Sequence, residues 1–236
     1  MKDFRASMPA AYARAFGLVE IGEHAGIAAR RGEQLVHAEL WTGLGGARVC
    51  VVAEDRPGLL ALVTDALLVY GLGIRSAQIY CRTRSDGRAE AVDFFELEAG
   101  KPSEASFVFA EAELSAFVQT LSDLVAEDVE AAARPSAAPK PSRPAARVYF
   151  ELEALRRNEF VLLVEAPNSE GLLNAITSAL HGQGARILAA EIRTENGVAR
   201  DRFDLASSDG GPLDAIRACD IQQAVFSALP GANARR

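Results

Sequence analysis

Hydrophobic residues follow a strand–helix–strand pattern over residues 49–81. The apolar run at residues 49–53 is typical of a covered strand. Apolar residues then recur at helical spacing over residues 59–70, and Gly71 and Gly73 end that helix. A second strand begins at Ile74. The pattern therefore predicts a β-α-β unit.

The turn between the first strand and the helix reads Asp55-Arg56-Pro57-Gly58. Asp55 suits a helix cap, and Pro57 fits a first helical turn, where its missing N–H costs nothing. Gly58 puts no side chain over the helix start, so backbone N–H groups there can face a carboxylate or another anion. We therefore take Asp55, Arg56, Pro57, Gly58 and Leu59 as a candidate ligand-binding site. The alternative is a capped helix start that binds no ligand.

The same pattern returns over residues 160–194, in register with the first. Gly171, Leu180 and Gly184 fall on Gly58, Leu67 and Gly71 at a constant offset of 113 residues. Downstream, after a shorter hairpin, residues 201–205 fall on residues 93–97. So many matched apolar and glycine positions predict an internal duplication.

The matching turn of the second repeat reads Asn168-Ser169-Glu170-Gly171. A second, weaker ligand site would comprise Asn168, Ser169, Gly171 and Leu172. Glu170 places a carboxylate next to where a ligand carboxylate would lie, and like charges there are unfavourable. A binding repeat and a purely structural repeat therefore both remain open.

The Asp-Arg-Pro-Gly-Leu-Leu turn, with its following Ile/Ala strand and Asp-x-Phe strand, resembles the ACT domain, a small ligand-binding regulatory module. In tandem, the two repeats resemble the C-terminal regulatory region of bacterial PII uridylyltransferase/uridylyl-removing enzymes, which sense glutamine. Met8-Pro9-Ala10-Ala11-Tyr12 with His24 resembles the segment upstream of those domains. Residues 146–150 resemble the strand that opens the second domain.

This resemblance implies an α+β fold with two ferredoxin-like ACT domains. Each would have a four-stranded antiparallel sheet with helices on one face, in a permuted β-β-α-β-β-α order, because hairpin strands at residues 35–41 and 147–154 precede the repeats. The expected organisation is an N-terminal helical segment (1–32), a first ACT domain (33–133), a Pro-rich linker (134–146), a second ACT domain (147–229) and a tail (230–236).

The function that the resemblance implies is regulatory amino-acid sensing, with glutamine as the ligand, in nitrogen or amino-acid metabolism. The alternative is an interaction module without ligand that docks on a PII-type protein or a separate catalytic chain, and a homodimer is also open. We expect no catalytic residue, cofactor or metal, because the family's carboxylate and His-Asp motifs are missing and His24, His37 and His181 lack metal-ligand spacing. Asp93 and Asp201 match each other, which favours a repeated structural role over a catalytic pair.

Composition argues against two further classes of partner, nucleic acids and membranes. The formal charge of −7 argues against nucleic acid, whose phosphates need a basic surface. No apolar run approaches the roughly 20 residues that span a bilayer, so no membrane partner is expected. Three isolated cysteines and the lack of a secretory signal pattern fit a cytoplasmic protein.

Overall fold

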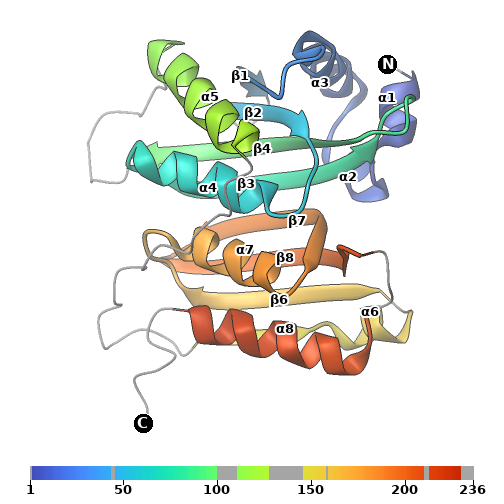
Figure 1. The fold of residues 1–236 in the computed structure, drawn as a ribbon, viewed down its shortest axis with the longest axis vertical. Helices are drawn as coiled ribbons and strands as arrows, with labels where there is room; N and C mark the ends of the chain where they lie inside the picture. The colour runs from blue at the N-terminus through green and yellow to red at the C-terminus, as the bar shows by residue number, and fades with distance from the viewer. Residues whose placement is uncertain are drawn as a thin grey trace. The chain divides into compact units, whose positions relative to one another are not determined.

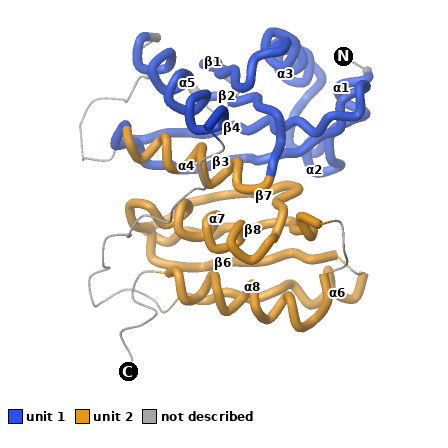
Figure 2. The backbone as a smooth tube through the Cα atoms, in the orientation of Figure 1, with its two compact units in different colours: residues 1–56, 70–129 blue, residues 57–69, 130–236 orange. Residues whose placement is uncertain are grey.

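The computed structural model describes residues 2–43, 46–99, 111–127, 146–157, 159–209 and 213–229 (Figure 1). Most of the Pro-rich linker, residues 134–145, and the tail at 230–236 lie outside this part. The fold is mixed α+β with antiparallel strands, which confirms the expected class. The chain divides into two compact units, residues 1–56 with 70–129 and residues 57–69 with 130–236 (Figure 2).

Unit 1 contains four antiparallel strands in the order β1-β2-β4-β3. Figure 1 shows helices α1–α3 and helix α5 on opposite faces of these strands. The strands are β1 (Val36–Gly43), β2 (Gly46–Glu54), β3 (Leu72–Thr83) and β4 (Ala89–Ala99), and the helices are α1 (Lys2–Ser7), α2 (Ala10–Ala15), α3 (Leu18–Arg31) and α5 (Glu111–Ala126).

The expected N-terminal helical segment consists of the three helices α1, α2 and α3. Pro9 precedes α2, and Gly17 precedes α3. The backbone N–H of Gly17 donates to the Glu20 carboxylate at 2.7 Å, which satisfies one donor at the start of α3. These two breaks let the short helices fold over the sheet.

Unit 2 contains strands in the order β5-β6-β8-β7, also antiparallel. Helices α7 and α8 lie together on one face of these strands in Figure 1. The elements are β5 (Arg147–Phe150), α6 (Leu152–Arg156), β6 (Phe160–Pro167), α7 (Leu172–Gly182), β7 (Ala185–Glu195), β8 (Val198–Ser207) and α8 (Ala215–Ala228).

The expected strand over residues 147–154 is wrong in its second half. The strand ends at Phe150, and α6 follows at once. Leucine, glutamate, alanine and arginine are good helix formers, which favours a helical turn there. The backbone N–H of Leu155 donates to the Glu151 carbonyl at 3.0 Å, so one turn of helix replaces the expected extended chain.

The two repeats share special backbone features at matching positions. Gly58 and Gly171 precede their helices with φ of 81° and 75°. Gly71 and Gly184 follow those helices with φ of 65° and 63°. Strand pairing shifts register after Ile74 in β3 and after Ile187 in β7. The internal duplication is therefore repeated in local conformation as well as in sequence.

Helix α4 (Leu59–Val69) packs within unit 2. It is apolar on nearly all sides, and Leu59, Ala61 and Leu67 are at most 3% exposed. On α7, the Asn174 amide donates to the Ala61 carbonyl at 3.2 Å and to the Thr64 hydroxyl at 3.3 Å. Sequence analysis assigned α4 to the first domain, residues 33–133, and the domain boundaries remain predictions.

Among the described helices, none combines the length and the apolar character needed to cross a membrane.

Candidate functional site

The first residues of the Asp55 turn are fixed to unit 1 by three hydrogen bonds. The Asp55 backbone N–H donates to the Ala89 carbonyl at 3.0 Å, and the Cys81 thiol donates to the Asp55 carboxylate at 2.8 Å. The Arg56 guanidinium donates to the Val125 carbonyl at 2.8 Å, in the last turn of α5. A cation is favourable at that helix end. Asp55 is thus a carboxylate held by the neighbouring strands.

Gly58 stands directly before α4, in a left-handed conformation that disfavours other residues. Its carbonyl accepts the first helical hydrogen bond, from Leu62 N–H at 3.1 Å. A Cβ atom at Gly58 would lie 3.1 Å from three ring atoms of His181. The sequence predicted an open helix start at Gly58 and Leu59, but the His181 imidazole occupies the space beside the glycine.

His181 was not predicted as a site residue. It lies in the last turn of α7, and only the packing of α7 against α4 brings it to Gly58. A contact between two helices so far apart in sequence leaves no local spacing signal. The imidazole can donate or accept a hydrogen bond, so it is a polar group beside Gly58 at the start of α4.

The second loop has the same framework with different charges. The Asn168 backbone N–H donates to the Gly197 carbonyl at 2.9 Å, as Asp55 does to Ala89. The Leu172 N–H donates to the Ser169 carbonyl at 3.1 Å, and Gly171 caps the start of α7. Glu170 is exposed. The second loop therefore keeps the turn and the helix start but has an amide where the first has the Asp55 carboxylate.

Asp93 and Asp201 are buried and have a repeated structural role. Asp93 accepts the backbone N–H of Tyr80 at 3.3 Å, and Asp201 accepts that of Arg193, the matching residue of the second repeat. Burial raises the pKa of Asp201 to about 7. Burial, followed by the nearby Asp55 carboxylate, raises the pKa of Asp93 well above its ordinary value. In both repeats the hydrogen-bond donor is a backbone N–H of the adjoining strand.

The Met-Pro-x-x-Tyr segment and His24 meet in the core of unit 1. The Tyr12 hydroxyl and His24 Nδ1 are 2.7 Å apart, and both side chains are fully buried. Burial, with a contribution from the Arg48 charge, lowers the pKa of His24 to about 4. Phe16 and Trp41 pack on the His24 ring with centroids 4.7 and 4.4 Å away. This cluster joins α2 and α3 to the sheet, and a neutral histidine there is structural.

The described residues contain no group of three or more His, Cys, Asp or Glu side chains that could hold a metal ion. His37 instead lies 2.6 Å from the Glu39 carboxylate.

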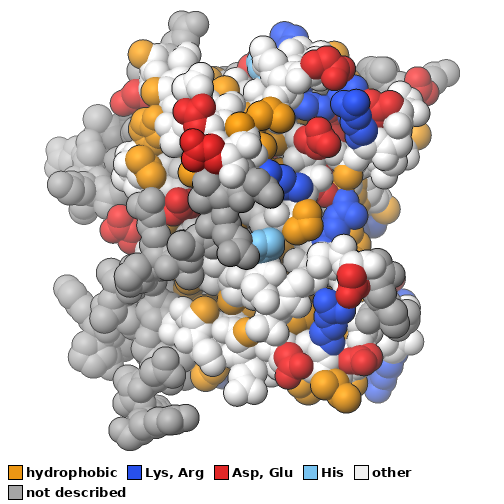
Figure 3. Space-filling model, in the orientation of Figure 1, with side chains coloured by type: hydrophobic (Ala, Val, Ile, Leu, Met, Phe, Trp, Pro, Cys, Tyr) orange, Lys and Arg blue, Asp and Glu red, His pale blue; other side chains and the backbone are white. Residues whose placement is uncertain are grey.

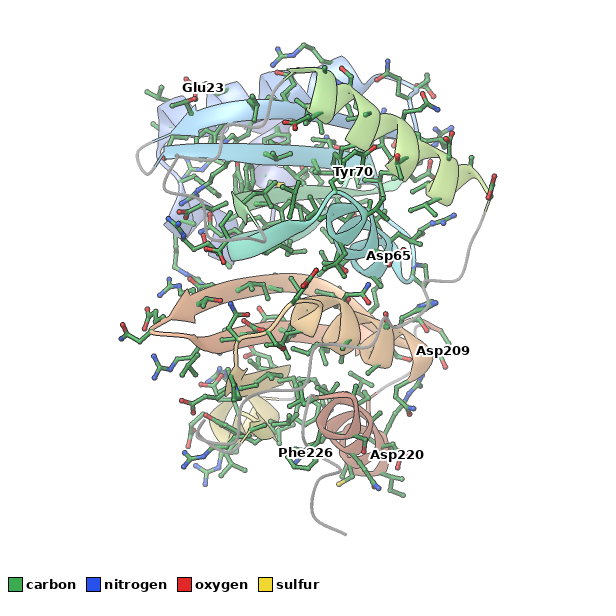
Figure 4. The ribbon with its side chains drawn as sticks, turned by 90° about the vertical axis from the view of Figure 1, so that its left-hand side faces the viewer. Glu23, Asp65, Tyr70, Asp209, Asp220 and Phe226 are labelled. Atoms are coloured by element: carbon green, nitrogen blue, oxygen red, sulfur yellow. The ribbon has the colours of Figure 1, made fainter. Side chains whose placement is uncertain are left out.

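An open groove of about 590 Å³ runs between α3 and β1. Gly22 and Gly26 line its helical side, and the exposed Val19 and Leu40 contribute apolar surface. Glu23, which projects from α3 at the outer side of unit 1 in Figure 4, accepts the Trp41 indole N–H at 2.7 Å. The groove therefore lies between a face of α3 and strand β1. Among the described strands, β1 pairs only with β2, so its other edge is not paired with any of them.

Figure 3 shows basic and acidic side chains next to each other over unit 1 on the face that it draws. Unit 1 also contains ion pairs such as Arg30–Glu39, in which a guanidinium nitrogen lies 2.7 Å from a carboxylate oxygen. The described side chains on that face thus form no extended patch of one charge.

Comparison with known proteins gives one distant curated relative and no match to a family model. The chain is 29% identical over 237 residues to the bifunctional uridylyltransferase/uridylyl-removing enzyme of Phenylobacterium zucineum. The match covers 97% of this chain but 24% of the length of that enzyme. A solved structure of an unknown protein from Galdieria sulphuraria aligns with a TM-score of 0.24 and 20% identity, over 79% of this chain and 90% of the other.

Proposed function

We propose that this chain is a regulatory module of two ACT domains that senses a free amino acid, glutamine, and has no catalytic activity of its own. The distant relative supports a regulatory role, because the chain matches only 24% of the length of a bifunctional enzyme. The repeated turns and bulges support two domains of the same fold. The expected setting is the cytoplasm, in nitrogen or amino-acid metabolism.

The observation that carries the proposal is the Asp55–Leu59 loop. An α-amino acid presents a carboxylate and an ammonium group close together. The N–H groups at the start of α4 suit the carboxylate, and the fixed Asp55 carboxylate supplies the opposite charge for the ammonium. Arg56, Pro57 and Gly58 form the turn that connects Asp55 to the helix start along the chain. Leu59 begins the helix.

A single helix start does not supply enough binding free energy, so the ligand needs further contacts with the protein. A helix start contributes about 0.3–1 kcal/mol to anion binding, whereas micromolar affinity corresponds to about 8 kcal/mol. His181, beside Gly58, is a polar side chain placed to contribute to binding at the start of α4. Glutamine adds a side-chain amide that donates and accepts hydrogen bonds, and a histidine ring can pair with either group.

The second loop is the weaker site of the two. Asn168, Ser169, Gly171 and Leu172 reproduce the backbone turn, but Asn168 has no charge to offer an ammonium group. We expect this repeat to bind glutamine less tightly than the first, or to serve as a structural counterpart.

A second function is favoured by the α3–β1 groove. A groove of mixed polar and apolar lining beside β1, which is an edge strand among the described strands, suits docking of another protein chain. In this reading the module binds a PII-type protein or a separate catalytic chain and needs no amino acid. A homodimer through this groove is a further outcome of the same experiments.

Thermal unfolding with and without glutamine separates the two functions. A ligand that binds the folded state at 100-fold excess over Kd stabilises it by about 2.7 kcal/mol. A sensor should show this gain with L-glutamine and a smaller gain with D-glutamine, which is the matched control. A module that docks on proteins should show neither gain, and that result would favour the groove as its functional surface.

A further inference from the structure

The hydrogen bonds that fix Asp55 end at the same two strands that hold the N-terminal helices. Ala89, which accepts the Asp55 N–H, and Cys81, which donates to its carboxylate, belong to β4 and β3. Between them in the ladder, Arg82 pairs with Glu90. Side chains alternate between the faces of a sheet, so Glu90 points away from the face of Ala89 and Ala91.

Glu90 is fully buried and binds three arginines, one each from α3, from β3 and from the turn after β3. Its carboxylate accepts Arg31 Nε, at the end of α3, at 3.0 Å. It accepts Arg82 Nε, on β3, at 2.7 Å. Arg84, just after β3, lies 3.5 Å away. One buried carboxylate thus accepts hydrogen bonds from guanidinium groups that are themselves largely removed from water, and Arg84 also pairs with Asp86 at 3.2 Å.

The same arginines extend the connection to α1 and to the residues that follow α3. Arg82 donates to the Ser7 hydroxyl at 3.1 Å, and its guanidinium lies 4.6 Å from the centre of the Phe4 ring. Arg31 donates to the Gln34 carbonyl at 2.6 Å. The Glu90 cluster, defined as Glu90 with Arg31, Arg82 and Arg84, therefore holds the N-terminal helices on the sheet.

We propose that the Glu90 cluster couples the Asp55 loop to helices α1–α3, so that an amino acid bound at the loop changes how firmly these helices pack. This proposal rests on the function proposed above and adds the structural change that amino-acid binding would cause. The physical reason is adjacency: Ala89 and Glu90 are consecutive, so a shift of the Asp55 backbone moves the strand that carries the buried carboxylate. A buried ion cluster tolerates such a shift poorly, because its charges have no water to replace lost partners.

Two measurements report on the packing of α1–α3 in the 236-residue chain. Hydrogen exchange reports their opening, and Trp41, the single tryptophan, reports packing of α3 because its ring lies against His24. Allosteric coupling typically changes an equilibrium by about 5- to 150-fold. We therefore expect saturating glutamine to change exchange over residues 2–31 by about fivefold or more, with a change in Trp41 emission.

Glu90→Gln should remove this response while calorimetry still detects glutamine binding. Glu98→Gln is the matched control, since Glu98 lies on the same face of β4 but pairs with the exposed Arg75. If Glu90→Gln does not fold, Ser7→Ala carries the test, because it removes the Arg82 contact and should lower the response of α1 while that of α3 remains.

The outcomes separate the two proposals. If the wild type binds glutamine but exchange over residues 2–31 is unchanged, the coupling is wrong and the sensor stands. An equal response in the wild type and in Glu90→Gln also overturns the coupling. If the wild type binds no glutamine, the sensor function itself is wrong, and the coupling is overturned with it.

Discussion

The contact between Gly58 and His181 can be tested by adding a single methyl group. Gly58→Ala introduces a Cβ atom 3.1 Å from the His181 ring, in a residue whose φ is 81°. Gly71→Ala is the matched control: φ is 65°, and nothing lies within 4 Å of its added Cβ. Both substitutions strain the backbone, but only the first meets a side chain.

The expected magnitudes follow from this difference. A left-handed conformation costs a non-glycine residue about 1–2 kcal/mol, which applies to both variants. Overpacking adds about 1–3 kcal/mol, and a histidine ring at a helix end can move by a few tenths of an ångström, so we expect about 1 kcal/mol extra for Gly58→Ala. Urea unfolding measures both free energies.

A double-mutant cycle isolates the ring contact. His181→Ala in the Gly58→Ala background should recover about 1 kcal/mol, whereas it should recover nothing in the Gly71→Ala background. Equal costs for the two alanine variants, with no coupling to His181, would show that the imidazole does not lie beside Gly58. The assignment of His181 to the ligand site would then be withdrawn.

Two further predictions concern stability. Leu67→Ala should cost about 2–5 kcal/mol in urea unfolding, because Leu67 is 1% exposed, while Val69→Ala, at a residue 54% exposed on the same helix, should stay within about 0.5 kcal/mol; similar losses would mean that α4 buries a different face. Asp201 has a folded pKa of about 7, above its ordinary 3.8, so its stabilisation is present below pH 3.8 and is lost as pH rises to 7. Between pH 4 and pH 7 this amounts to about 3 kcal/mol, which Asp201→Asn should remove from the difference in unfolding free energy between those two pH values; an unchanged difference would contradict the buried carboxyl.

Much of the fold follows from local patterns. The helical spacing of α4 and the glycines that bound it predict its limits, and the constant offset predicts the second repeat. The short helix α6 was missed because it follows β5 almost directly. Its few residues therefore resemble a continuation of that strand. An apolar helix such as α4 also carries no pattern that says which neighbours it packs against.

The candidate site was predicted in part. The turn Asp55-Arg56-Pro57-Gly58 has a local signature, since turn and capping residues act on their own backbone. Cys81 and His181 contact this turn through tertiary packing, which no spacing along the chain records. Glu90 was likewise invisible, because a glutamate in a strand is usually exposed and only the folded chain gathers arginines around it.

Calorimetric titration of L-glutamine into the wild type, Asp55→Ala and Asn168→Ala tests the central claim most directly. Asp55 offers a fixed carboxylate for the ammonium group, and Asn168 occupies the matching place without a charge. Charged hydrogen bonds contribute about 1.5–3 kcal/mol, so Asp55→Ala should weaken binding by about tenfold or more, and Asn168→Ala should change it little. Binding that survives Asp55→Ala but not Asn168→Ala would place the site in the second repeat, and a wild type that binds no amino acid at millimolar concentration would contradict the sensor.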